Sequence, residues 1–255
     1  MKLWRTARVL SLVLLMGTLA GSVLLTPAQE LKLPRPLEEI VRYFAQKEAE
    51  YARAHARYDY RLTIKLQELD SSGNILGEFT ETLAVSHSPT GKRIDRIVEG
   101  PKSSLQYLAI TRVELFDLRD VPLFTVNPEH LSLYQFDYLG PERVDEVDTF
   151  VFRVAPTAVR PPSPLFEGLL WVDTEKLDII KAFGRTLPSH GAGVLKDYFP
   201  RVEIYREPVD DYLFPTYLQG DDVLRVAEET VHARMILRFS DHQRVAPPPA
   251  LPPQT

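Results

Sequence analysis

The stretch LFEGLLWVDTEKLDIIKAFGR, residues 165–185, is the best organised part of the sequence. An apolar run at 169–173 is followed by the polar triplet 174–176 and by a second apolar run at 177–185. Two short apolar runs joined by a tight polar turn are typical of a β-hairpin that faces a core. The hairpin carries no recognisable nucleophile, metal-binding motif or phosphate-binding loop. Its apolar face is therefore the feature whose function has to be explained.

A longer hairpin is predicted earlier in the chain. Apolar side chains occupy alternate positions from Tyr58 to Leu66, with polar residues between them. A period of two over this length is typical of a half-buried strand. The turn-forming cluster at 70–74 follows, and a second strand is expected at 75–87 with Phe79, Leu83 and Val85 on one face.

The remaining chain predicts further strands with short connections. Strands are expected at 92–98, 131–139, 149–155, 202–206, 214–218 and 231–240. Turns are expected at 140–141 and 207–211. A Pro-rich loop is expected at 156–164 and a Gly-rich loop at 188–193. Short connections favour antiparallel pairing, and a sheet of nine to eleven strands has to curl or close. We predict a mainly β protein with one or more covering helices, in which one wide antiparallel sheet curls or closes into a barrel.

One helix is predicted before the first hairpin. Between Leu37 and His55 the apolar residues fall mostly on one face at a spacing of three or four, with charged residues elsewhere. This amphipathic pattern indicates a helix that covers a core. A helix that lies on a membrane surface is the alternative.

Both ends of the chain have a biased composition. Lys2, Arg5 and Arg8 precede an uncharged apolar run at 9–25, and small residues follow up to Ala28. This order predicts a secretory signal peptide, residues 1–28, cleaved after Ala28. An uncleaved inner-membrane anchor is the alternative, because the run is at the lower limit of a membrane span. Residues 37–240 are expected to form a single domain, and 245–255 a Pro-rich, disordered or polyproline-like tail.

Charge and cysteine content restrict the partners. The chain has a formal net charge of −5, and loss of the three basic residues of the signal makes it −8. An acidic exported chain lacks the basic surface that nucleic acids require, so we expect no nucleic-acid partner. There is no cysteine, so the core must be stable without disulfides and no lipid can be attached at an N-terminal cysteine.

Catalytic and metal-binding patterns are not recognised. The six histidines lack the spacing of a helix-borne zinc site, and no GxSxG, GxGxxG or Walker-type loop is present. His190 is interpreted as a surface-loop histidine, and the acidic pairs at 145–148, 210–211 and 221–222 as solvated turns. We therefore predict no enzyme activity, no metal and no cofactor. A hydrolase with a dispersed site that uses His190 is the alternative.

Many aromatic residues lie in the predicted strands, and they suggest a binding role. They could fill an ordinary core, or they could line an apolar cavity that a curled sheet leaves open and that accepts an acyl chain. The expected cavity-lining residues are Tyr60, Leu62, Ile64, Leu83, Val85, Phe136, Phe150, Phe152, Trp171 and Leu237.

Several features together resemble the LolA-like family of periplasmic lipoprotein carriers, with the related LolB-like, LppX-like and RseB-type proteins. They are the signal peptide, the amphipathic helix, the long hairpin at 58–87, and the order DTFVFRVAP (148–156) followed by GLLWVDTEKLDIIKAFG (168–184). The resemblance covers most of residues 37–240. It implies an unclosed barrel whose helices form a lid over a lipid-binding cavity.

The third strand departs from that family. GKRIDRIVEGPKSSL (91–105) lacks the arginine-proline-aromatic stretch in which an arginine latches the lid. Arg93 and Arg96 are the candidates for the missing arginine, and the sequence does not choose between them.

The resemblance implies a monomeric periplasmic carrier of lipid or acylated lipoprotein that moves its cargo toward the outer membrane and meets envelope transport proteins. A periplasmic sensor or protein-binding domain on the same fold is the alternative.

Overall fold

The computed structural model describes residues 33–88, 92–119, 121–158, 165–187, 201–226 and 229–245. The pattern of contacts divides the chain into Met1–Glu30 and Leu31–Thr255, and every described residue belongs to the second unit. The predicted signal peptide, the loop with His190, residues 159–164 and the tail from residue 246 lie outside the described residues.

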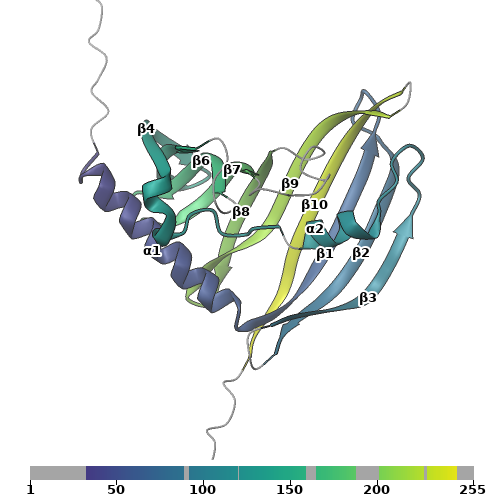
Figure 1. Cartoon of the computed structure of the whole chain (residues 1–255), viewed down its shortest axis with the longest axis horizontal. Helices are drawn as coiled ribbons and strands as arrows, with labels where there is room; N and C mark the ends of the chain where they lie inside the picture. The colour runs from purple at the N-terminus through teal and green to yellow at the C-terminus, as the bar shows by residue number, and fades with distance from the viewer. Residues whose placement is uncertain are drawn as a thin grey trace, which may run out of the picture. The chain divides into compact units, whose positions relative to one another are not determined.

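Two α-helices, a short 3-10 helix and ten strands are described (Figure 1). Their order is α1 (Leu37–His55), β1 (Tyr58–Leu69), β2 (Ile75–His87), β3 (Arg93–Ser103), α2 (Arg112–Arg119), η1 (Pro128–Leu133), β4 (Tyr134–Val144), β5 (Val147–Pro156), β6 (Leu165–Asp173), β7 (Ile179–Leu187), β8 (Val202–Val209), β9 (Tyr212–Val226) and β10 (Glu229–Arg244).

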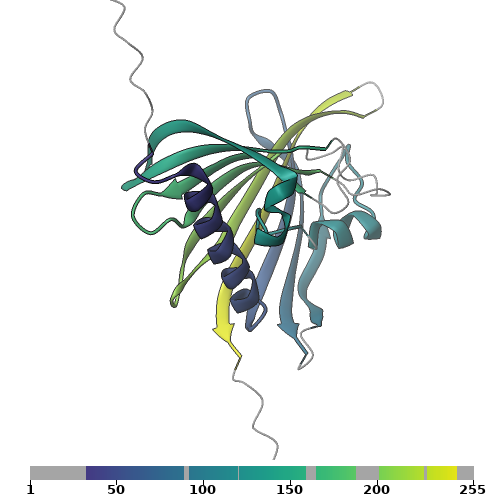
Figure 2. The same ribbon diagram turned by 60° about the vertical axis from the view of Figure 1, so that its left-hand side comes forward.

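The ten strands form one antiparallel sheet in the order β3-β2-β1-β10-β9-β8-β7-β6-β5-β4. The first and last strands of the chain pair in the middle, and β3 and β4 are the two unpaired edges. The sheet curls without closing, and α1 and α2 lie on its inner side (Figure 2). This confirms the predicted fold class.

The hydrophobic pattern explains the best predicted elements. α1 begins directly after Pro36, carries two glutamates in its first turn and ends with Arg53 and His55 in its last turn. Both charge placements complement the helix dipole. Its buried residues, among them Ile40 and Phe44, form the stripe that the period of 3.6 predicts. The hairpin of β1 and β2 and the hairpin of β6 and β7 are also confirmed.

Two facing glycines allow β6 and β7 to approach each other closely. Gly168 and Gly184 are paired across β6 and β7. A Cβ atom on Gly184 would lie 2.2 Å from the carbonyl oxygen of Glu167 and 2.6 Å from the ring of Phe166. Only residues without a side chain permit this close approach of the two backbones, and the Phe166 ring covers the gap.

Several predicted boundaries are wrong. Gly140 and Pro141 do not turn the chain but lie inside β4, where Gly140 (φ 130°) follows a shift in register. The turn comes at Asp145, whose φ is 52°. Asp221 and Asp222 are not in a turn but in β9.

The lengths of several connections also differ from those predicted. The link between β8 and β9 contracts to Asp210 and Asp211, β3 extends to Ser103, and the strand expected from 131 begins at Tyr134 after η1. α2 lies between the strands expected at 92–98 and 131–139, where the sequence analysis names no element. Thr111 and Glu114 cap α2 by binding each other's backbone N–H groups, an arrangement called a capping box.

Candidate functional site

The inner face of the sheet brings together most of the predicted binding residues. One apolar cluster contains eight of them in buried positions, and Phe136 packs against it partly buried. The eight are Tyr60, Leu62, Ile64, Leu83, Val85, Phe150, Phe152 and Leu237. They come from β1, β2, β5 and β10, so only the curl of the sheet places them in one cluster.

Trp171 is the exception and lies on the outer face. Its neighbours Leu170 and Val172 point into the inner cluster, and side chains alternate along a strand. The Lys181 ammonium lies 5.0 Å from the centroid of the Trp171 ring, a cation–π contact, and also 5.0 Å from that of the Tyr205 ring. The prediction that Trp171 lines an inner cavity is therefore wrong. An uninterrupted apolar run hides which residues face inward.

A segment of the chain itself covers the inner face. We call residues 104–133, which join β3 to β4, the cover segment; they include α2 and η1. Leu118 and Val126 are buried in the inner cluster. The other apolar residues of the segment that pack against the cluster are only partly buried: Leu105, Leu108, Ile110, Leu115, Val121, Leu123, Leu131 and Leu133. The cover segment is thus an apolar layer between the sheet and solvent.

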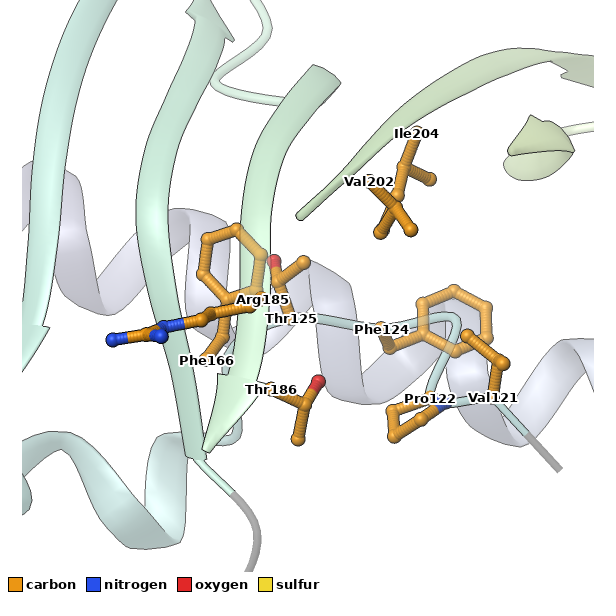
Figure 3. A pocket seen from close by; sticks show the side chains of 9 residues that line it. All are labelled: Val121, Pro122, Phe124, Thr125, Phe166, Arg185, Thr186, Val202 and Ile204. Carbon is orange, nitrogen blue, oxygen red and sulfur yellow. The ribbon is translucent and has the colours of Figure 1, made fainter. Parts of the chain in front are cut away.

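The space beneath the cover segment is small. A pocket of about 40 Å³ lies between the cover segment and the strands β6 to β8 (Figure 3). Pockets for drug-sized ligands measure roughly 300–1,000 Å³. A cargo chain would therefore have to displace side chains of the cover segment from this place. The lining residues are Val121, Pro122, Phe124, Thr125, Phe166, Arg185, Thr186, Val202 and Ile204.

Buried ionic groups hold α1 and the cover segment to the sheet. Glu48 of α1 receives two hydrogen bonds from the Arg206 guanidinium of β8, one of them at 2.9 Å, and both side chains are at least 99% shielded from solvent. The same carboxylate accepts the backbone N–H of Thr125 at 2.9 Å. One glutamate thus joins α1, the cover segment and the sheet.

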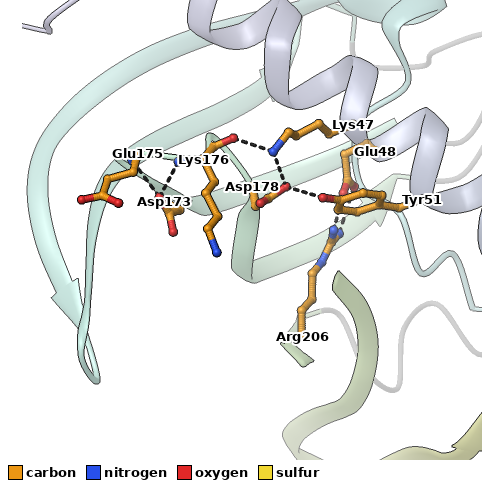
Figure 4. A network of polar contacts seen from close by, with 8 residues as sticks. All are labelled: Lys47, Glu48, Tyr51, Asp173, Glu175, Lys176, Asp178 and Arg206. Atoms are coloured by element: carbon orange, nitrogen blue, oxygen red, sulfur yellow. Dashed lines mark hydrogen bonds and ion pairs between the residues drawn. The ribbon is translucent and has the colours of Figure 1, made fainter. Parts of the chain in front are cut away.

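A second contact joins α1 to the turn between β6 and β7. Asp178 accepts hydrogen bonds from Lys47 at 2.9 Å and from the Tyr51 hydroxyl at 2.7 Å (Figure 4). Burial, followed by the hydrogen bond to Asp178, raises the pKa of Tyr51 well above its usual range. Tyr51 therefore stays protonated and remains a donor.

The cover segment is tied to β1 and β2 by two more glutamates. Glu68 is fully buried and accepts the backbone N–H groups of Gln106, Tyr107 and Leu108 at 2.6–2.8 Å. Glu81, also buried, binds Arg119 at the end of α2 at 2.5 Å.

Arg93 completes this attachment. Its guanidinium donates to the carbonyl oxygen of Arg119 at 2.6 Å. Of the two arginines that the sequence left open, Arg93 is the one that reaches the cover segment. Arg96 pairs with Ala84 in the neighbouring strand, on the other face of β3.

The sequence analysis missed the glutamates, although their positions carried a signal. Glu48 lies on the apolar stripe of α1, four residues after Phe44. Glu68 of β1 and Glu81 of β2 stand at positions of the alternating pattern whose side chains point inward. A carboxylate at a position where the pattern places apolar residues needs a partner inside the protein, because burying an unpaired charge is costly.

The described residues contain no group of three or more His, Cys, Asp or Glu side chains that could hold a metal ion. No helix among them is both long and apolar enough to cross a membrane.

No family model matches the sequence, and no curated protein is significantly similar to it. The solved structures that are similar include a DUF1329 family protein from Desulfovibrio piger, 11% identical with a TM-score of 0.39, over 85% of this chain and 95% of that chain. A LolA superfamily protein from Nitrosomonas europaea is 14% identical with a TM-score of 0.37, over 82% and 95%.

A third similar structure is the Pseudomonas aeruginosa MucA/MucB complex, in which the matched chain is 12% identical with a TM-score of 0.24, over 79% of this chain and 99% of that chain. With identities of 14% or less and TM-scores below 0.4, these similarities assign no family, ligand or partner to this chain.

Proposed function

We propose that this chain is an exported carrier that binds lipid or lipoprotein acyl chains on the inner face of its half-barrel and moves them across the periplasm toward the outer membrane. The observation that carries the proposal is the continuous apolar inner face, covered by a segment whose own apolar side chains are mostly half-buried. Such a segment can be exchanged for another apolar chain.

The exchange keeps the apolar inner face of the sheet covered. Displacing the cover segment exposes apolar surface, and an acyl chain that takes its place buries a similar area again. Each buried methylene contributes about 0.8 kcal/mol. A chain of a dozen methylenes thus offers on the order of 10 kcal/mol against the cost of opening and of association.

The attachments of the cover segment suggest how it opens. α2 is held at its end by Glu81 and Arg93, and the segment before it by Glu68. Together with the bond from Thr125 to Glu48, these are a few polar contacts at three points, so we propose that the cover segment acts as the lid and that α1 stays in place. A transport partner in the envelope would act on this lid during loading and release.

Tethering the lid tests the proposal. The chain has no cysteine, so the double variant Glu81→Cys, Arg119→Cys can be joined by a bis-maleimide without side reactions. We expect the untethered variant to take up a fluorescent fatty acid faster than the wild type, and the tethered protein to take up none. Each single-cysteine variant, treated with the same reagent, is the control.

Native mass spectrometry of the protein purified gently from the periplasm gives an independent readout. Co-purified lipid supports the carrier. Protein that arrives empty and takes up no fatty acid in the untethered form would overturn it.

A protein-binding domain is the second candidate, and the edge strand β3 favours it. Ile94 and Ile97 of β3 are each 50% exposed, and Val98 39%. An exposed apolar edge can pair with a strand of a partner protein. Ile94→Lys should then abolish capture of a periplasmic partner and leave fatty-acid uptake unchanged. The opposite pattern would exclude this candidate.

A further inference from the structure

The central ladder of the sheet opens between β9 and β10. The two strands are paired from Val226 and Glu229 as far as Tyr217 and Arg238. Beyond that point β10 continues alongside β1 and β9 continues alongside β8, but β9 and β10 no longer pair with each other. The shift in register at Asp59/Arg61 and the positive φ of Asp241 (55°) accompany the separation.

The separation of β9 and β10 leaves a groove between them. Its volume is about 550 Å³, within the range of roughly 300–1,000 Å³ that ligand sites occupy. β8 and β9 form one wall and β10 the other. The lining residues are Tyr205, Glu207, Val209, Thr216, Tyr217 from the first wall and Arg238, Phe239, Ser240, Asp241, His242 from the second.

The groove presents flat aromatic faces. The hydroxyl groups of Tyr205 and Tyr217 donate to Glu203 and Gln219 on their own strands, which fixes the two rings. The Arg238 guanidinium lies over the Tyr217 ring, 5.7 Å from its centroid. Fixed aromatic faces of this kind suit apolar rings and flat backbone segments.

The groove also contains buried polar atoms without a partner. Thr216 is 8% exposed, and its Oγ1 has no hydrogen-bond partner. The Nε2 atom of His242 is likewise buried and unpaired. Leaving such groups unsatisfied costs about 1–3 kcal/mol each, so a ligand that bonds to them gains this energy.

The charges of the groove favour an uncharged ligand. The lining contains Arg238 against Glu207, and Asp241 is neutralised by Arg61 at 3.2 Å. A proline-rich segment has this chemistry. It has carbonyl acceptors and almost no N–H donors, and its rings pack in grooves lined by aromatic side chains.

The chain itself supplies such a segment at the end of β10. Residues 246–255, APPPALPPQT, contain five prolines and no charged side chain. Val245, directly before them, is anchored by its backbone N–H to the carbonyl oxygen of Arg57 at 2.8 Å.

The distances permit a return into the groove. The groove residues of β10, 238–242, lie three to seven residues before Val245, or about 10–23 Å along the strand. Ten residues in polyproline geometry span about 31 Å. We propose that residues 246–255 fold back and dock in the groove between β9 and β10 of the same molecule.

The proposal needs only weak intrinsic affinity. A short tether gives an effective concentration of the order of 1 mM, so a free-peptide Kd near 1 mM already occupies about half of the grooves. The proposal concerns the opening between β9 and β10 and does not require the inner face to bind lipid.

A peptide titration tests it. The receptor is the full chain with the five tail prolines replaced by serine, and the probe is fluorescently labelled APPPALPPQT, followed by anisotropy. We expect a Kd at or below about 1 mM, and at least about twofold weaker binding to the wild-type chain, whose own tail competes.

Two groove variants, made in the serine-tail background, locate the site. Thr216→Val removes the unpaired hydroxyl at constant shape and should weaken binding at least fivefold without loss of fold. Tyr217→Ala should weaken it further, and Tyr107→Ala, an exposed tyrosine of the cover segment (42% exposed), is the matched control.

No binding up to about 5 mM peptide, or equal binding by Thr216→Val and its parent, overturns the proposal. Dimers of the wild-type chain that the serine-tail variant does not form would also overturn it, because the occupant would then be the tail of a second copy.

Discussion

Glu48 and Arg206 form an ion pair that is entirely shielded from solvent, with Nη2 of the arginine 2.9 Å from Oε2 of the glutamate. The pair joins α1 to β8 across 158 residues of sequence. Phe124 packs beneath the guanidinium, whose carbon lies 5.5 Å from the centroid of the ring. The position of α1 on the inner face is thus fixed by a charge pair inside an apolar environment.

Removing one partner should be far more costly than removing both. Arg206→Met leaves Glu48 charged and buried, and we expect a loss of about 3–5 kcal/mol in the free energy of unfolding. The double variant Glu48→Leu, Arg206→Met should recover much of this loss. Urea denaturation followed by circular dichroism measures both. As the control, Asp221→Ala breaks the exposed pair with Arg234 and should cost less than about 1 kcal/mol.

Glu68→Gln should loosen the start of the cover segment without unfolding the sheet. The amide retains only one acceptor oxygen for the three backbone N–H groups that the carboxylate binds. We expect faster hydrogen exchange at Gln106, Tyr107 and Leu108, corresponding to a local loss of about 1–3 kcal/mol. The exposed Glu99→Gln is the control. Unchanged exchange at the three amides in Glu68→Gln would contradict the role of Glu68.

Gly184→Ala should destabilise the sheet strongly. The new methyl group would lie 2.2 Å from the carbonyl oxygen of Glu167, so the two strands have to separate. We expect a cost of more than about 3 kcal/mol, in the range of severe steric substitutions. Gly73→Ala, in a turn with φ +85° and open space around it, should cost only about 1–2 kcal/mol. Thermal unfolding distinguishes the two variants.

The stability should fall at acid pH because of His55. This residue is 6% exposed and its ring packs against Tyr60, Phe124, Phe214 and His242. Burial, with smaller contributions from the charges of His242, His87 and Arg93, lowers the pKa of His55 to about 3.

The pH dependence of the stability follows from the difference in proton binding between the folded and unfolded chains. The unfolded chain binds a proton at His55 near pH 6.5, whereas the folded chain does so only near pH 3. Stability contributed by the neutral ring is therefore present above pH 6.5 and is lost at up to about 1.4 kcal/mol per pH unit as the pH falls toward 3. His55→Phe should flatten the difference between pH 7 and pH 5 in urea denaturation. An unchanged difference would mean that His55 is not its source.

The regular parts of the fold could be predicted because their cause is local. The alternation in 58–87 and the spacing of three and four in 37–55 each follow from which face of one element is buried. Where the apolar run is unbroken, as around Trp171, the sequence loses this information, and the side of the sheet is decided by the strand's neighbours.

The sequence by itself determined that this is an antiparallel β protein with one amphipathic helix, and it identified most of the inner face, because hydrophobic periodicity is a property of neighbouring residues. Only the tertiary structure decided which partners the inward glutamates have, that the chain's own cover segment occupies the inner face, and that β9 and β10 part. These features depend on contacts between residues up to 158 positions apart, such as Glu48 and Arg206, and no local pattern records where such distant segments meet.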